Sequence, residues 1–177
     1  REATRMQSLV SDLMSLSRIE AIRHEAPSDR VDMVSLCREV IGERPRDVEV
    51  SFVSNADQAY VTGDHAQLAQ AFRNLVDNAE KYGGSEKGTK VQLEASERGW
   101  LTLSITDHGE GIAPEHLPRL TERFYRVSTQ ESRSRGGTGL GLAIVKHIVL
   151  RHRGKLEIFS KPGQGSIFTV TIPVYKS

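Results

Sequence analysis

The chain has 177 residues, 37% of them hydrophobic, and its 24 basic and 23 acidic side chains leave a net charge of +1. A chain of this length can bury one good core, and its charge gives no reason to expect nucleic acid or an anionic membrane as a partner. No apolar run approaches the roughly 18 residues of a membrane-spanning helix, and nothing at the amino end resembles a signal peptide. Because the single cysteine, Cys37, cannot form an intramolecular disulfide, we expect a reducing compartment and a core position for it.

The first segment predicts one long helix that ends before Pro27. Its apolar residues recur at alternating spacings of three and four, which is typical of a helix that packs against other helices. They are Met6, Leu9, Val10, Leu13, Leu16 and Ile19. Such a stripe belongs either to an ordinary core helix or to a fragment of a helical bundle. We favour the fragment, because the segment lies outside the mixed pattern that follows, and we place the boundary between residues 1–26 and 27–177.

The second part of the chain predicts an α+β domain. Expected helices cover residues 31–44, 65–82, 114–120 and 141–152, the second capped by Asp64 and the third opened by Pro114. Expected strands lie within residues 48–53, 58–63, 89–107 and 154–173, where the last two ranges each form a hairpin. This order predicts a two-layer sandwich, in which helices cover one face of a mixed, mostly antiparallel sheet.

The helix from His65 to Tyr82 carries an unusual polar flank. A helical wheel separates a core stripe (Leu68, Phe72, Leu75, Val76, Ala79), a group that points away from it (Arg73, Asp77, Glu80) and a flank (Asn74, Asn78, Lys81, Tyr82). Two asparagines alone could belong to a solvated flank. The lysine and the aromatic ring on the same edge favour a ligand groove, since amide oxygens bind hard cations such as Mg2+, lysine meets phosphate and tyrosine covers a flat ring.

A second candidate element is the stretch "SITDHGEGI", in which a strand ends at Asp107 and Gly109 and Gly111 follow. These glycines let the backbone approach a ligand closely, and a carboxylate at the strand end can accept a hydrogen bond from an exocyclic amine. An ordinary turn would use the same residues. The stretch gains weight only together with the asparagine helix.

The third candidate element is "RGGTGLGLAIVKHIV", which begins at Arg135. Its glycines expose backbone N–H groups at the start of a helix, an arrangement suited to phosphate, although the Walker A pattern is missing. The polar loop over residues 126–137 precedes it. We expect a lid that closes over phosphates, and the competing interpretation is a disordered surface loop with a glycine-rich helix cap.

Four motifs in this order resemble the N, G1, F and G2 boxes of the catalytic ATP-binding domain of sensor histidine kinases: "NLVDNAEKY", "DHGEGI", "ERFYR" and "GGTGLGLAIVKHIV". The resemblance covers about residues 31–173 and implies a Bergerat-type ATP-binding fold, with ATP and Mg2+ as cofactors. The segment "RMQSLVSDLMSLSRIEA" is similar to the second helix of the dimerisation and phosphotransfer hairpin of such kinases. The wording "GGTGLGLAIVKH" is similar to phosphate-regulon sensor kinases.

The resemblance implies a role for each matching residue. Asn78 would be the Mg2+ ligand, and Asn74, Lys81 and Arg126 would be catalytic groups at the metal and the phosphates. Tyr82 would lie against the adenine, from whose amine Asp107 would accept a hydrogen bond. The other nucleotide-binding positions would shape the adenine pocket, anchor the lid or face the phosphates: Gly109, Gly111, Ile112, Phe124, Thr138, Gly139, Leu140, Gly141 and Leu142.

Three classes of function compete for this site. A hydrolysing ATPase of the superfamily would carry a water-activating glutamate one turn before the metal ligand, where this chain has Asn74. Phosphoryl transfer needs mainly positioning and charge neutralisation, so a histidine kinase ranks first. The alternative is a nucleotide-binding regulatory or interaction module without phosphotransfer.

The chain lacks the family's acceptor motif, which begins with His-Glu and has proline five residues after the histidine. The only such pair is His24-Glu25, and Pro27 follows three residues after His24. We therefore expect the acceptor hairpin helix, the sensor and the membrane segments outside this chain. The expected partners are that hairpin and a response-regulator receiver domain, and the whole protein would be a membrane-anchored homodimer with this part in the cytoplasm.

Overall fold

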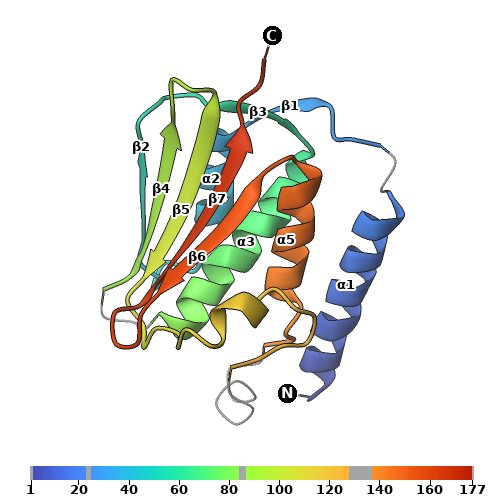
Figure 1. The fold of residues 1–177 in the computed structure, drawn as a ribbon, viewed down its shortest axis with the longest axis vertical. Helices are drawn as coiled ribbons and strands as arrows, with labels where there is room; N and C mark the ends of the chain where they lie inside the picture. The colour runs from blue at the N-terminus through green and yellow to red at the C-terminus, as the bar shows by residue number, and fades with distance from the viewer. Residues whose placement is uncertain (1, 23–24, 84–86, 128–136, 177) are drawn as a thin grey trace.

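The computed structural model describes residues 2–22, 25–83, 87–127 and 137–176. Three helices, α2 (Met33–Gly42), α3 (His65–Tyr82) and α5 (Gly141–Arg151), cover one face of a five-stranded sheet, and α1 (Glu2–Ala21) lies beside α5 on the outer side (Figure 1). The predicted two-layer α+β sandwich, preceded by one long helix, is confirmed.

The main sheet has the strand order β2-β4-β5-β7-β6, which comprises Val50–Ser54, Thr89–Ala95, Trp100–Asp107, Ser166–Pro173 and Lys155–Ser160. β2 pairs with β4 in parallel, and the other neighbours pair antiparallel. A separate antiparallel pair is formed by β1 (Asp29–Asp32) and β3 (Tyr60–Gly63). The β5–β7 register places Asp107 opposite Ser166, so a polar pair stands at the sheet end nearest the later part of α3.

The core lies between the sheet and the helices. Along β5, Leu101, Leu103 and Ile105 are buried at alternate positions, as expected for a strand with one covered face. They meet the apolar stripe of α3, which includes Phe72 and Leu75. The core stripe predicted for this helix is therefore confirmed, and its burial fixes which flank of α3 remains available for a site.

Two predicted helices differ from the structure. Residues 31 and 32 belong to β1, and the helix starts only at Met33, because the Asp32 carboxylate accepts a hydrogen bond from the Val34 amide and caps α2. Residues 114–120 contain only a short 3-10 helix, η1 (Leu117–Arg119). Pro118 has no amide hydrogen, so a longer helix would not gain its bond there.

The long first helix is confirmed, but only part of its apolar stripe is buried. Leu16 and Ile19 pack into the core beside α5, whereas Met6 is 67% and Val10 is 53% exposed. None of the described helices has the length and apolar character needed to cross a membrane.

Candidate functional site

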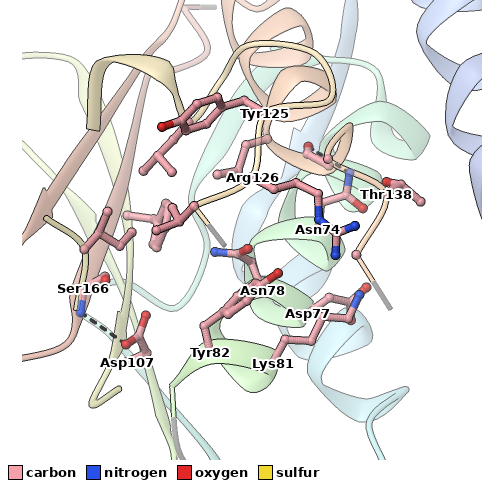
Figure 2. A pocket seen from close by; sticks show the side chains of 18 of the residues that line it. Asn74, Asp77, Asn78, Lys81, Tyr82, Asp107, Tyr125, Arg126, Thr138 and Ser166 are labelled. Carbon is pink, nitrogen blue, oxygen red and sulfur yellow. Dashed lines mark hydrogen bonds between the residues drawn. The ribbon is translucent and has the colours of Figure 1, made fainter. Parts of the chain in front are cut away.

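A cavity of about 350 Å3 lies between α3, the end of β5 and the start of α5 (Figure 2). Most of the residues expected at the site line it. They are Asn74, Asn78, Lys81, Tyr82, Asp107, Gly111, Ile112, Arg126, Thr138, Gly139, Gly141 and Leu142. Segments far apart in the sequence thus meet around one space, as the three candidate elements predicted.

The α3 wall of the cavity consists of side chains spaced by one helical turn. Asn74, Asn78 and Lys81 point into the cavity from successive turns, with Tyr82 beside them (Figure 2). The Asn74 amide nitrogen donates to the Gly141 carbonyl oxygen over 3.3 Å, which ties α3 to the first residue of α5.

Asp107 ends β5 and is buried. Its Oδ1 accepts hydrogen bonds from the Gly109 amide at 3.0 Å and from the Ser166 amide at 3.2 Å. Burial raises the pKa of the Asp107 carboxyl, although these two amides oppose the shift. Among the described residues, no hydrogen bond reaches Oδ2. That oxygen is therefore an acceptor for a ligand donor in the cavity.

The opposite end of the cavity brings together an aromatic hydroxyl and a guanidinium. A Cβ atom placed on Gly137 would lie 3.2 Å from the Tyr82 hydroxyl and 3.8 Å from Arg126 Nη2. Tyr125 lies next to Arg126 on this wall and shares a 2.6 Å hydrogen bond with His116. The Arg126 guanidinium therefore places a positive charge at this end of the cavity, next to Gly137.

Gly139 is required by a close approach of two backbone segments. Its φ is +77°, and an added Cβ would lie 2.9 Å from the Phe124 Cα. The Phe124 amide donates to the Gly139 carbonyl oxygen at 2.8 Å, so the start of α5 is joined to the end of the segment that follows η1. Phe124 acts here through its backbone, since it has φ +64° and is 56% exposed.

Three expected site residues do not line the cavity, namely Gly109, Phe124 and Leu140. Leu140 is fully buried in the core at the start of α5. Gly109 lies against Tyr82, because an added Cβ would stand 1.9 Å from the Tyr82 carbonyl oxygen. Gly109 thus packs against the backbone of Tyr82, which lines the cavity.

Sequence reasoning missed several lining residues, which are Ser8, Asp12, Asp77, Glu110, Leu120, Tyr125, Val127, Ser166 and Phe168. The helical-wheel grouping is wrong for Asp77, because this side chain lines the cavity while it also faces α2. Alternation along β7 could have suggested Ser166 and Phe168 as a pair on one face. Nothing local to α1 could have indicated Ser8 or Asp12, since these depend on how the helix packs.

The expected lid falls largely on residues 128–136, which lie outside the described residues, and so does His24. The described ends of the glycine-rich segment, Gly137 to Gly141, do border the cavity.

The side chains at the cavity fit a magnesium site that the ligand completes. The described residues contain no group of three or more His, Cys, Asp and Glu side chains that could hold a metal. Mg2+ is commonly bound by one or two protein oxygens together with substrate phosphates and water. Asn78 and Asn74 offer amide oxygens of the right hardness at the cavity wall.

Comparison with known proteins assigns the fold and the motifs to one family. Residues 63–176 match the family model described as histidine kinase-, DNA gyrase B- and HSP90-like ATPase. The chain belongs to this family. The matched range contains α3, Asp107 and the start of α5, so most of the cavity lining lies within it, whereas Ser8 and Asp12 of α1 lie outside it.

Relatives within this family are sensor kinases. The chain is 42% identical over 174 residues to the phosphate regulon sensor protein PhoR of Pseudomonas aeruginosa, which covers 96% of this chain and 39% of that protein. It is 38% identical over 179 residues to the sensor-like histidine kinase SenX3 of Mycolicibacterium smegmatis, which covers 98% of this chain and 46% of that one. The chain thus spans less than half the length of these relatives.

Solved structures agree with this assignment. Full-length ShkA in complex with AMPPNP superposes with a TM-score of 0.83 at 27% identity, over all of this chain and 38% of that one. The mycobacterial sensor histidine kinase MprB superposes with a TM-score of 0.69 at 30% identity, over 85% of this chain and 99% of that one. The likeness to ShkA therefore extends beyond the residues that match the family model, over the whole chain.

Proposed function

We propose that the chain binds ATP with Mg2+ in this cavity and forms the catalytic part of a sensor histidine kinase. The observation that carries the proposal is the buried Asp107, whose Oδ1 is held by two backbone amides while Oδ2 remains an acceptor in the cavity. Oδ2 would accept a hydrogen bond from the exocyclic amine of adenine, and the Tyr82 ring would lie against the base.

The other end of the cavity suits the triphosphate. Lys81 and Arg126 bring positive charge, and the backbone N–H groups at the start of α5 add donors near Thr138 and Gly141. Asn78 would hold Mg2+ through its amide oxygen, with Asn74 as a second polar group. When bound, the ion supplies neutralisation of the phosphate charge.

The reaction class follows from Asn74. An amide cannot take a proton from water, so this position supplies no general base for hydrolysis. Its nitrogen is in addition engaged by the Gly141 carbonyl oxygen. We therefore propose transfer of the γ-phosphoryl group to a histidine outside this chain, in which the bond from phosphorus to the β–γ bridging oxygen breaks as a bond to an imidazole nitrogen forms.

The proposed partners and setting follow from the sensor kinases that the chain resembles. We propose that residues 1–26 are the second helix of a dimerisation and phosphotransfer hairpin, and that a receiver domain accepts the phosphoryl group in turn. The exposed Met6 and Val10 of α1 support a helical partner for this face. The whole protein would be a membrane-anchored homodimer whose catalytic part is cytoplasmic.

The proposal is tested in two steps. Isothermal titration of the chain with ATP and Mg2+ should give saturable binding, and absence of binding would refute the ATP site. Radiolabelled ATP should then leave the chain alone unlabelled. It should label an added kinase chain that carries the full hairpin with its acceptor histidine but has its own ATP site disabled by an Asn-to-Asp change. ATP binding without any transfer to the hairpin would favour the regulatory module instead. Acid-labile, base-stable label on the chain itself, lost in His24→Ala, would make His24 the acceptor.

A further inference from the structure

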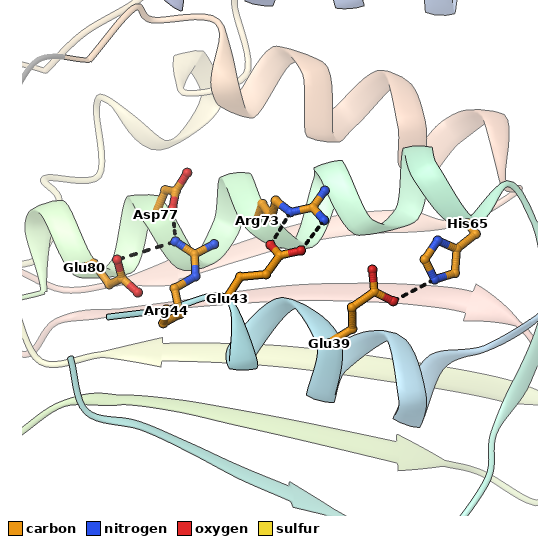
Figure 3. Close-up of polar contacts among 7 residues, drawn as sticks. All are labelled: Glu39, Glu43, Arg44, His65, Arg73, Asp77 and Glu80. Carbon is orange, nitrogen blue, oxygen red and sulfur yellow. Dashed lines mark hydrogen bonds and ion pairs between the residues drawn. The ribbon is translucent and has the colours of Figure 1, made fainter. Parts of the chain in front are cut away.

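An arginine outside the family motifs contacts a residue that lines the cavity but does not line the cavity itself. Arg44 follows the end of α2 and its guanidinium binds the Asp77 carboxylate of α3, with Glu80 3.6 Å away (Figure 3). The Arg44 side chain is only 13% exposed. Its backbone amide donates to the Ile41 carbonyl oxygen at 3.0 Å, and Pro45 follows, so the main chain at this arginine is restrained.

Asp77 belongs to both the ion pair and the cavity. It lines the same space as its neighbour Asn78 and as Lys81, one turn further along α3 (Figure 2). Its side chain is 44% exposed. A carboxylate at this place repels a polyphosphate, because like charges at short range raise the energy of both. The site therefore contains a charge that opposes its proposed ligand.

Arg44 itself does not line the cavity, so its charge acts on the ligand through Asp77. Within the described residues, its buried Nε has no hydrogen-bond partner, and one Oε1 of the neighbouring Glu80 is likewise buried and unbonded. The guanidinium is thus directed by its contact with Asp77. A largely buried arginine that bonds the exposed Asp77 carboxylate, with the Glu80 carboxylate 3.6 Å away, offsets negative charge at Asp77 and restricts the rotation of that side chain.

We propose that Arg44 is a positioning residue that holds the Asp77 carboxylate at the rim of the cavity and cancels its charge, so that the site accepts a triphosphate. The proposal rests on the proposed ATP site. Arg44 should therefore favour binding of nucleotides with more phosphates, because the repulsion between Asp77 and the ligand grows with the charge of the ligand.

A purely structural bridge between α2 and α3 is the competing explanation, and the chain contains a matched control for it. Arg73 of α3 binds Glu43 through two hydrogen bonds of 2.6 and 2.7 Å, just beside Arg44 (Figure 3). This pair joins the same two helices, yet neither residue lines the cavity. Arg73 also interacts electrostatically with Asp77, but it is the more exposed cation and is bonded to Glu43, so its loss should change the charge at the ligand less than the loss of Arg44.

The experiment compares binding of AMPPNP, ADP and adenosine to the wild type, Arg44→Met, Asp77→Asn, the double variant and Arg73→Met. Arg44→Met should lose on the order of fivefold in AMPPNP affinity, less for ADP and none for adenosine, with the loss shrinking at high salt. Asp77→Asn should bind AMPPNP at least as tightly as the wild type. The double variant should match Asp77→Asn, while Arg73→Met should lose clearly less AMPPNP affinity than Arg44→Met.

Each failure has a distinct meaning. If the wild type binds none of these ligands, the proposed function fails before the role of Arg44 is tested. The inference is overturned if Arg44→Met weakens the binding of adenosine as much as that of AMPPNP, or if Arg73→Met loses as much AMPPNP affinity as Arg44→Met. It is also overturned if adding Asp77→Asn to Arg44→Met does not restore AMPPNP affinity. Should Arg44→Met not fold, the single variant Asp77→Asn decides, since weaker AMPPNP binding in it contradicts charge cancellation.

Discussion

Thr138 at the start of α5 donates a 2.6 Å hydrogen bond from its hydroxyl to the carboxylate of Asp12 in α1. The same hydroxyl accepts a hydrogen bond from the Leu140 amide at 3.2 Å. Both Asp12 and Thr138 line the cavity, so the first helix supplies part of its wall. The position of α1 and the phosphate-facing segment are thereby linked through one contact.

We predict that Asp12→Ala loosens α1. A hydrogen bond to a carboxylate contributes about 1.5 to 3 kcal/mol, so local opening of α1 should become easier by roughly 10- to 100-fold. Hydrogen exchange of the α1 amides measures this. The control is Ser11→Ala, one residue before Asp12 and exposed, which should exchange like the wild type. Equal protection of α1 in Asp12→Ala and the wild type would show that the contact does not hold the helix.

Asp107→Asn should weaken ATP binding without unfolding the chain. The asparagine Oδ1 can still accept from Gly109 and Ser166, but an NH2 group replaces Oδ2 and meets the adenine amine donor to donor. We expect about a tenfold loss of affinity. Isothermal titration measures it, and unchanged affinity would remove Asp107 from the adenine site.

Asp107→Asn should also change the stability of the chain. Because burial raises the pKa of Asp107 above its ordinary value of 3.8, its contribution to the free energy of unfolding is most favourable below pH 3.8 and declines as pH rises through the folded pKa. At neutral pH Asp107→Asn should therefore be at least as stable as the wild type without ligand. Asp107→Ala, which leaves two amides unbonded, should lose about 1 to 3 kcal/mol. Thermal unfolding compares the three chains.

Gly139→Ala should be much more disruptive than Gly163→Ala. The two glycines have nearly the same φ, +77° and +78°, but an added Cβ meets Phe124 at Gly139 and nothing within 4 Å at Gly163. The conformational cost alone is about 1 kcal/mol. Urea unfolding should show about that loss for Gly163→Ala, and at least about 2 kcal/mol more for Gly139→Ala. Equal losses would mean that the segment before α5 shifts freely.

His152 should make the fold sensitive to mild acid. Its Nε2 accepts from the Asp64 amide at 3.0 Å, and its Nδ1 lies 2.7 Å from the Ile148 carbonyl oxygen, so the ring is buried in the neutral form. Burial lowers the pKa of His152 below 6.5. Since the unfolded chain then binds the proton more tightly, the free energy of unfolding should fall as pH drops below 6.5, by up to about 1.4 kcal/mol per pH unit.

Urea unfolding between pH 5.5 and 7.5 tests this dependence. His152→Gln removes the titrating group and should flatten the profile relative to the wild type. A wild-type profile with no slope, or the same slope in both chains, would assign the acid sensitivity elsewhere.

Local patterns in the sequence determined the elements and the side chains that share a flank. Asp64 caps α3 through a 3.0 Å bond from the Gln67 amide, three residues away, as its place before an apolar-periodic segment indicated. The grouping of Asn74, Asn78 and Lys81 on one polar flank followed from the helical period, and all three side chains line the cavity. Such features depend on backbone geometry within a few residues, so a single sequence contains them.

Tertiary packing alone decided which of these flanks meet. Asp107 is bonded by Ser166 because β5 pairs with β7 in one register, and a shift of one residue would turn that partner away. The Thr138 bond to Asp12 and the Arg44 contact with Asp77 join residues 126 and 33 positions apart. No local period encodes such pairs, because they arise only when every apolar face of the chain is buried at once.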